Sequence, residues 1–397
     1  MITIESAESA LRNIYLESVI NDINTKTNPF LTMISKNTKT IADKEAKVSV
    51  RYGNEANVGV GAEGGTLPAG NTQFAEIAVP LKNLYGTFQI TDKAIRAAQN
   101  NAGAFAALLS GEMKNLIGAA QANLNRMVYG NGLTYLGYSD SRDDTNRKFT
   151  VPVKQLGNFK VGMNVTLYAA TNQVASIPLE ITAINTNTGE ITYGTSGTVY
   201  TNKYDRLYVY APSQTGEMNG IDSLFMTDKL YNLTSSQHKG ILPCNVIDNG
   251  TTLEILDEEE ILKFFDAYEE HCQSIPADIL MTHPNVKKAL FETLRDTRSN
   301  IATADLAGGF KGFTFNGIPL YSDLKCKAGV LYALNSESFA THQLCDWTWL
   351  AGDDGSILRQ MDGKPVYSAT LVKYADLICE KPFLQGKVSG YAANSWS

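Results

Sequence analysis

One glycine pattern in the sequence could bind a dinucleotide. Gly59, Gly61 and Gly64 have the G-x-G-x-x-G spacing. In a dinucleotide-binding fold, these glycines lie between a strand and a helix whose N-terminus faces the pyrophosphate. Here the segment continues through Gly65 and Pro68, and no helix can begin until well past that proline. The pattern therefore predicts a glycine-rich loop, and we expect no cofactor.

The residue types used in hydrolysis and zinc binding are present, but not at a spacing typical of either. The histidines are His238, His271, His283 and His342, and none belongs to an H-E-x-x-H motif, which places two metal ligands on one helical face. No G-x-S-x-G motif occurs either. A cytosolic hydrolase that uses Cys272 or a serine therefore stays open as an alternative without a motif to support it.

Two acidic clusters have simpler structural interpretations. Residues 258–260 are glutamates that fit the first turn of a helix, where carboxylates interact favourably with the helix dipole. Asp353 and Asp354 precede Gly355, which is typical of a hairpin turn and provides too few oxygen ligands for calcium. The cysteines are widely spaced and include no C-x-x-C pair. We therefore predict no metal site and no catalytic residue.

The composition is that of an ordinary folded protein. Hydrophobic residues make up 43% and charged residues 19% of 397 residues, which is enough chain for more than one domain. The net charge of -7 and the lack of a basic block argue against a dedicated nucleic-acid binder. The N-terminal residues lack the pattern of a signal peptide, and no apolar run is long enough to span a membrane. We expect no membrane association.

The longest regular element that the sequence predicts is a helix over residues 101–130. Its apolar positions recur at intervals of three, four and eight residues, which is typical of one helical face: Phe105, Leu109, Met113, Leu116 and Leu124. At about 1.5 Å per residue the helix would be roughly 40 Å long. Alanines and glycines elsewhere leave a slim surface, so we expect other elements to pack closely along it.

Before this helix, the pattern predicts a long hairpin. Residues 48–52 alternate as a strand does, and residues 74–91 read as one long or kinked strand that could return beside them. The glycine-rich loop between them has roughly 20 residues, which is unusual inside a compact domain. Ahead of the hairpin, residues 5–22 predict an amphipathic helix within an N-terminal arm. Its apolar side must be covered within the chain or on a neighbour.

After the long helix, the chain changes character twice. Residues 150–212 are rich in Val, Ile, Thr and Tyr with closely spaced turns, which predicts a small inserted barrel or sandwich. From residue 257 onward, helical and strand patterns mix, and the last predicted strands are 366–373 and 376–384. The fold class is therefore α+β.

The order of these elements resembles the major capsid protein of tailed bacteriophages. The resemblance covers most of the chain outside residues 133–215. It is carried by the hairpin from Arg51 to Asp92, the helix from Ala102 to Tyr129 and the closing segment from Lys364 to Leu384. Because the order and length of the elements carry the match, the resemblance concerns the architecture as a whole.

The resemblance implies a division into six parts. These are an N-terminal arm (1–46), an extended hairpin of a peripheral domain (47–92), the rest of that domain with its spine helix (93–132), the inserted β module (150–212), an axial domain (220–362), and terminal strands that return to the peripheral domain (363–397). It further implies that the hairpin tip contacts a neighbouring subunit through Glu63, Gly64, Gly65, Thr66 and Pro68.

The function implied by the resemblance is structural and not enzymatic. Copies of the chain would assemble as hexamers and pentamers into an icosahedral head around double-stranded DNA, which would be held by weak non-specific contacts. Assembly would take place in the cytoplasm of the host bacterium, and the protein would end in the virion. A scaffolding protein, a portal and a decoration protein are the implied partners. The alternative within the same fold is a nanocompartment shell that encloses cargo protein.

Two departures from the family bear on assembly. Some members carry a long scaffolding segment ahead of the arm, whereas this sequence begins almost at the arm, which implies a separate scaffold or a mature form. Some members cross-link through a lysine in the hairpin, but residues 51–81 contain no lysine. We therefore predict no isopeptide cross-link from this hairpin. A ladder of covalent multimers on a denaturing gel of mature shells would contradict that prediction.

Overall fold

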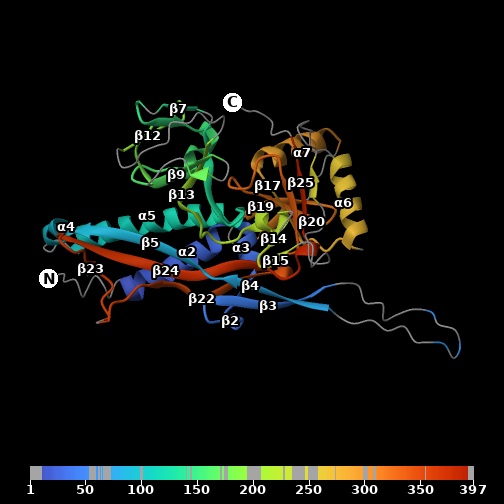
Figure 1. Ribbon diagram of the computed structural model, residues 1–397, viewed down its shortest axis with the longest axis horizontal. Helices are drawn as coiled ribbons and strands as arrows, with labels where there is room; N and C mark the ends of the chain where they lie inside the picture. Colours follow the sequence, from blue (N-terminus) through green and yellow to red (C-terminus); the bar gives the residue numbers. More distant parts are fainter. Residues whose placement is uncertain are drawn as a thin grey trace. The chain divides into compact units, whose positions relative to one another are not determined.

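The structure is a computed structural model of the chain (Figure 1). It describes residues 11–52, 60, 63, 65, 73–98, 102–139, 141–143, 145–169, 172–173, 178–194, 207–226, 229–234, 246–248, 258–272, 274–297, 303–306, 310–353 and 355–391. The chain divides into two compact units. The first unit comprises Met1–Asn131 and Met218–Ser397, and the second comprises Gly132–Glu217.

The described part of the first unit begins with short helices. A π-helical turn at Leu11–Tyr15 leads into α2 (Leu16–Lys26), and α3 (Pro29–Met33) follows. Asn28 caps α3, because its side-chain oxygen accepts a hydrogen bond from the backbone N–H of Phe30. The strands β1 (Ser35–Asn37) and β2 (Ile41–Ala42) come next.

The predicted hairpin is built from β3 (Glu45–Tyr52) and β4 (Gln73–Pro80), which pair antiparallel along their whole length. The segment predicted as one long or kinked strand, residues 74–91, forms two strands with different partners. The chain breaks pairing at Leu81 and continues as β5 (Lys82–Thr91), which pairs with β24 (Val366–Cys379) instead. The alternation of apolar and polar residues continues through both strands. It therefore gave no sign that β4 and β5 pair with different strands.

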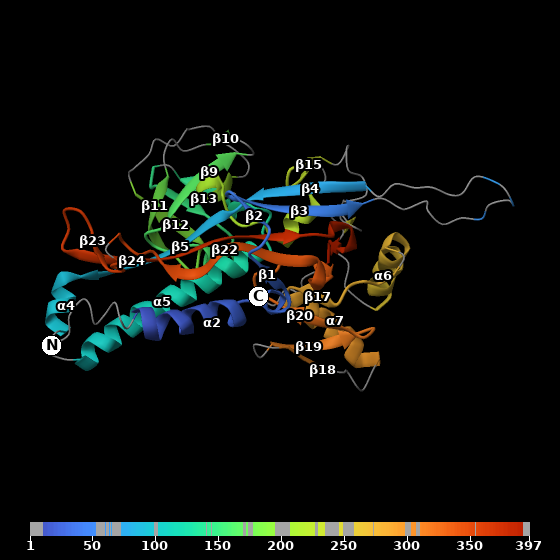
Figure 2. The ribbon, with the colours of Figure 1, turned by 90° about the horizontal axis from the view of Figure 1, so that it is seen from below.

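Helices α4 (Asp92–Ala98) and α5 (Ala102–Val128) follow β5. Helix α5 occupies the region of the predicted long helix. Its last turn is closed by the backbone N–H of Gly130, which donates to the carbonyl of Met127 at 2.9 Å. Figure 2 shows α2 alongside α5.

Strands far apart in the sequence form the long sheet of the first unit. Its order is β1-β22-β24-β23, and β5 also pairs with β24; β22 is Phe339–Trp349 and β23 is Arg359–Gln360. The predicted strand 366–373 lies within β24, but the second predicted strand, 376–384, is wrong, because β24 runs unbroken to Cys379 and a 3-10 turn follows at Pro382–Leu384. The charged residues within β24 are buried, and they interrupted the apolar pattern from which a strand is recognised.

A second sheet of the first unit has the order β16-β25-β21-β17-β20-β19-β18. Its elements are β16 (Val246–Asp248), α6 (Glu258–Cys272), β17 (Ile279–Thr282), α7 (Pro284–Thr297), β18 (Thr303–Leu306), β19 (Phe310–Phe315), β20 (Ile318–Ser322), β21 (Leu331–Leu334) and β25 (Gly386–Ser389). Helices α6 and α7 share one hydrophobic core with this sheet.

The last two strands of the chain lie in different sheets. Strand β24 pairs with β5, but the last strand, β25, pairs with β16 and β21 of the second sheet. The assignment of residues 363–397 to the peripheral domain stays a prediction, and β25 is a strand that the sequence did not predict. Val388 of β25 is buried in the core that α6 and α7 form with that sheet, and this burial holds β25 in the sheet.

The second unit is a β structure with a core of its own. Its sheet has the order β6-β13-β9-β11-β12-β8-β7, with β10 paired to β9. The strands are β6 (Leu133–Ser139), β7 (Ser141–Asp143), β8 (Lys148–Thr150), β9 (Asn164–Ala169), β10 (Asn172–Gln173), β11 (Leu179–Ile184), β12 (Glu190–Tyr193) and β13 (Leu207–Thr215). The predicted β module, residues 150–212, falls within this unit.

Candidate assembly elements

The stem of the hairpin has one buried face and one exposed face. Val48 pairs with Ile77, and Val50 pairs with Ala75; all four side chains are buried. Because side chains alternate across a strand, Lys47, Ser49 and Glu76 lie on the opposite, exposed face. Phe74 lies at the far end of the same face, and its side chain is 65% exposed. The stem therefore presents a large apolar side chain to its surroundings.

A small hairpin of the same unit holds the stem in place. It consists of β14 (Lys229–Leu230) and β15 (Leu233–Thr234). In the turn between them, the side-chain amide of Asn232 donates to the carbonyl of Glu76 at 3.1 Å and accepts from the N–H of Ala78 at 3.0 Å. These bonds satisfy backbone groups on the edge of β4, so the base of the hairpin is anchored to its own chain.

The predicted contact residues of the hairpin tip are only partly covered by the structure. Glu63 and Gly65 are described, and both are exposed, as is Val60. Gly64, Thr66 and Pro68 lie outside the described residues. The role of these residues in contacts between subunits stays a prediction.

Helix α5 presents its predicted apolar face to the core of the first unit. Leu109, Met113, Leu116 and Leu124 are buried there, whereas the side chain of Phe105 lies outside the described residues. A Cβ atom added to Gly86 of β5 would lie 2.9 Å from a methyl carbon of Leu116. The helix therefore packs directly on β5, and glycine at this position permits the close approach.

A polar network joins α5 to elements on both sides. The amide of Asn125 donates to both carboxylate oxygens of Asp323, at 3.0 and 2.9 Å, and its oxygen accepts from the amide of Asn28 at 2.7 Å. Burial raises the pKa of Asp323, and the bonds from Lys325 and Asn125 oppose that shift. The network connects the cap of α3, the helix and the loop after β20.

The N-terminal segment, residues 11–46, is packed on its own subunit. The indole N–H of Trp349 donates to the carbonyl of Leu11 at 3.1 Å, and β1 runs parallel to β22. Phe30 is fully buried and meets Phe339 edge to face at 4.9 Å. The sequence left open whether the chain itself or a neighbour covers the apolar side of the arm. Here the chain itself covers it.

One carboxylate ties this segment to the long sheet. Asp346 accepts hydrogen bonds from Lys36 at 2.7 Å, Lys373 at 2.9 Å and the amide of Asn24 at 3.1 Å. Burial alone would raise the pKa of Asp346, but the two lysines hold it well below its usual range. Burial lowers the pKa of Lys373, and Asp346 opposes that shift.

A second carboxylate with two lysines lies at the other sheet. Asp222, in the 3-10 helix at Ile221–Phe225, accepts from Lys387 at 2.7 Å, from Tyr332 at 3.1 Å and from Lys327. Burial would raise its pKa, but the lysines lower it. The ammonium of Lys387 also lies over the ring of Phe225 at 5.6 Å. This cluster joins β25 to the segment that follows the second unit in sequence.

Two buried titratable groups are cross-strand neighbours between β22 and β24. Asp376 is fully buried and accepts from the backbone N–H of Asn219 at 2.7 Å and from its amide at 2.8 Å. Burial raises the pKa of Asp376 to about 7. Its register partner His342 is also fully buried, and Nδ1 of this ring lies 2.6 Å from the hydroxyl of Thr40. Burial lowers the pKa of His342.

The side chains considered for catalysis are dispersed. The thiol of Cys272 donates to the carbonyl of Phe383 at 3.4 Å, and Nδ1 of His283 accepts from the N–H of Asn285 at 3.2 Å. His238 lies outside the described residues. In the part of the chain that the structure describes, His, Cys, Asp and Glu side chains form no group of three that could hold a metal. None of the described helices combines the length and apolar character needed to cross a membrane.

Comparisons with known proteins bear on the fold. No protein-family model and no curated protein matches the sequence. Among solved structures, the capsid of cyanophage A-1(L) is 12% identical with a TM-score of 0.55, over 92% of this chain and 93% of that chain. The chain has a phage capsid fold. The expectation of an α+β capsid fold is thereby confirmed, and at this identity the likeness concerns the fold alone.

Other capsid-like structures match less closely. The capsid of a native GTA particle is 8% identical with a TM-score of 0.47, over 92% of this chain and 90% of that chain. An encapsulin complex from Synechococcus elongatus PCC 7942 is 8% identical with a TM-score of 0.46, over 94% and 90%. Because both TM-scores are below 0.5, the assignment of the phage capsid fold depends on the cyanophage structure.

Sequence reasoning missed the polar clusters of this capsid fold. Asp346 and Lys36 are 310 positions apart, and Asn125 and Asp323 are 198 apart, so no local motif records either pair. One signal was available. Lys373 and Asp376 interrupt an otherwise apolar run in the closing segment, and a charge inside a buried strand requires a partner. That pattern could have indicated that Lys373 and Asp376 are buried and paired, but it could not identify their partners.

Proposed function

We propose that the chain is a structural subunit of a phage head. Copies assemble as hexamers and pentamers into an icosahedral shell that encloses double-stranded DNA, and the protein is a virion component without enzymatic activity. The observation that carries the proposal is the likeness in fold to the cyanophage capsid over 92% of the chain. The likeness extends over nearly the whole chain, so it is not confined to one common supersecondary motif.

The hairpin of β3 and β4 is the element best suited to bind a neighbouring subunit. Its base is fixed by Asn232, while Phe74 and the polar face are exposed. A stem anchored at one end can add contact area to a neighbour at a low cost in entropy, and symmetry repeats that contact around the shell. We propose that the tip residues, from Glu63 to Pro68, continue this contact.

The remaining parts follow the same scheme. Helix α5 is the spine of the peripheral domain, the sheet covered by α6 and α7 belongs to the axial domain, and the second unit is an accessory module that stabilises the shell through a neighbour. A separate scaffolding protein, a portal and a decoration protein are the expected partners, and DNA is held by weak non-specific contacts. The host cytoplasm is the expected place of assembly.

Expression of the full chain tests the proposal. The chain is produced alone and together with the genes that neighbour it, and is examined by size-exclusion chromatography and negative-stain electron microscopy. Icosahedral shells support the proposal, and their contents separate a DNA-filled head from a compartment that encloses cargo protein. A uniform small oligomer under all conditions would contradict it and favour the hydrolase alternative.

A further inference from the structure

A small cavity lies where the N-terminal segment, α5 and the long sheet meet. Its volume is about 30 Å³. A buried water needs roughly 10–15 Å³ on the same measure, so the cavity can hold one monoatomic ion or very few waters, and not sulfate or phosphate. Its lining residues are Asn24, Leu31, Ile34, Lys36, Leu84, Leu124, Met218, Thr341 and Lys373.

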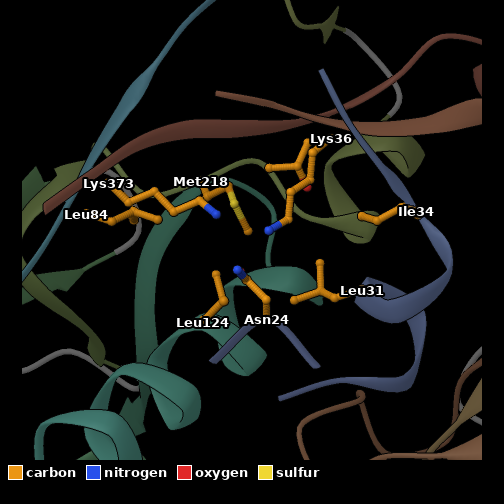
Figure 3. A pocket seen from close by; sticks show the side chains of 9 residues that line it. Asn24, Leu31, Ile34, Lys36, Leu84, Leu124, Met218 and Lys373 are labelled. Carbon is orange, nitrogen blue, oxygen red and sulfur yellow. The ribbon is translucent and has the colours of Figure 1, made fainter. Parts of the chain in front are cut away.

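The polar groups that line this cavity are mainly hydrogen-bond donors. Figure 3 shows the side-chain nitrogens of Lys36, Lys373 and Asn24 converging on its centre. No carboxylate belongs to the lining. The remaining walls are aliphatic apart from Met218 and the hydroxyl of Thr341. Thr341 has no side-chain partner among the described residues, so this hydroxyl can also donate.

The charges around the cavity are not balanced. The two lysines share one carboxylate, that of Asp346, which leaves one excess positive charge. The side chain of Lys373 is only 5% exposed, and among the described residues Asp346 is its one hydrogen-bond acceptor. An ammonium group has three N–H donors, and leaving buried donors without acceptors is costly. A second acceptor, preferably an anion, is therefore favoured beside Lys373.

We propose that this cavity binds a single monoatomic anion, which is chloride under ordinary conditions. The anion accepts hydrogen bonds from Lys373, Lys36 and Asn24, with the hydroxyl of Thr341 as a further donor. A halide is weakly hydrated compared with a carboxylate, so aliphatic walls are compatible with it. The bound ion links residues 24–36 to β22 and β24, and it thereby holds the N-terminal segment in place. The inference does not depend on the proposed function.

The chain provides a matched control. Lys387 and Lys327 also share one carboxylate, that of Asp222. This carboxylate accepts a further hydrogen bond from Tyr332, as Asp346 does from Asn24, and Lys387 lies over the ring of Phe225, as Lys373 lies over the ring of Trp347. Neither lysine lines the cavity. Both clusters are subject to general ionic screening, so a difference between halide and gluconate that is lost only with Lys373 indicates a bound ion.

Thermal unfolding of the full-length chain tests the proposal, with sodium chloride or bromide compared with sodium gluconate at equal ionic strength. Above the dissociation constant, the midpoint is expected to rise by about 2 °C for each tenfold increase in halide, because a ligand that binds only the folded state stabilises it. Lys373→Met is expected to abolish this dependence and Lys387→Met to retain it. Thr341→Val is expected to weaken halide binding roughly threefold to tenfold.

Equal midpoints in halide and gluconate for the unaltered chain would overturn the proposal. So would the same halide dependence in Lys373→Met. If Lys373→Met does not fold, crystals of the unaltered full-length chain grown in bromide decide the question. An anomalous peak within hydrogen-bond distance of the Lys373 ammonium supports the site. Ordered water without an anomalous signal means that water supplies the second acceptor, and the halide site is then rejected.

Discussion

The N-terminal segment and the β3–β4 hairpin differ in how much of their apolar surface their own chain covers. Both were candidates for covering a neighbour. In the N-terminal segment, Leu11, Val19, Ile23 and Phe30 are all fully buried. In the hairpin, one face is buried whereas Phe74 on the other face remains 65% exposed. The segment therefore contributes to the stability of the subunit, whereas the hairpin keeps an exposed apolar side chain, which we propose binds a neighbour.

The largest effect is expected from matched Phe→Ala substitutions in the two regions. Phe30→Ala removes a fully buried ring that packs on Phe339, and should lower the free energy of unfolding by about 3–5 kcal/mol. Phe74→Ala should change it by no more than about 0.5 kcal/mol, because the ring is exposed. Denaturant unfolding of unassembled subunits measures both. Equal losses would remove the distinction between the regions.

A pH dependence should arise at Asp376 of β24, whose register partner His342 contacts Thr40 of the N-terminal segment. The raised pKa of Asp376, about 7 against 3.8, means that the folded state binds the extra proton. Binding of this proton therefore stabilises the folded state at low pH. As pH rises from about 4 to about 7, the free energy of unfolding falls by an amount on the order of 4 kcal/mol. The charge of Lys82 lowers the pKa of Asp376 and so opposes the effect of burial, and the charge of Asp376 in turn raises the pKa of Tyr231.

Asp376→Asn isolates this contribution. The lowered pKa of His342 makes stability change with pH in the opposite direction. The unfolded state then binds more protons, so stability rises with pH. Relative to Asp376→Asn, the unaltered subunit should lose stability between pH 4 and pH 7 in denaturant unfolding. Parallel pH profiles would show that Asp376 keeps an ordinary pKa in the folded chain.

The link between the N-terminal segment and α5 should have an intermediate effect. Asn125→Ala leaves the buried carboxylate of Asp323 without its two bonds from the amide and should cost about 1–3 kcal/mol of unfolding free energy. Gln121→Ala on the same helix removes one bond to the carbonyl of Asp22 and serves as the control, with a loss of roughly 0.5–1.5 kcal/mol. If the two variants were equally stable, the network would not act as the link.

The smallest effect on stability should accompany a clear effect on assembly. Phe74→Ser should leave unfolding of the subunit within about 0.5 kcal/mol but reduce the yield of shells in electron microscopy and sedimentation, because the exposed ring is then missing from the contact. Tyr85→Ser, on the outward face of β5 and 58% exposed, is the control outside the hairpin. Normal shell yield from Phe74→Ser would assign the contact to other residues.

Local periodicity alone determined several elements of this protein. The spacing from Leu109 to Leu124 predicted the buried face of α5, and alternation in residues 48–52 predicted a strand of the hairpin. These predictions succeed because the periods of 3.6 and 2 follow from backbone geometry within a few residues. The order of such elements along the chain was enough to indicate the capsid fold.

The tertiary structure decided what local patterns do not contain. It placed β25 in the sheet beside α6 and α7, covered the N-terminal segment with its own chain, and gave Lys373 and Asp376 their partners inside a buried strand. Burying a charge is unfavourable unless a partner and hydrogen bonds compensate it. Those partners, such as Lys36 for Asp346 and Asn219 for Asp376, come from distant parts of the chain, so only the folded arrangement brings them together.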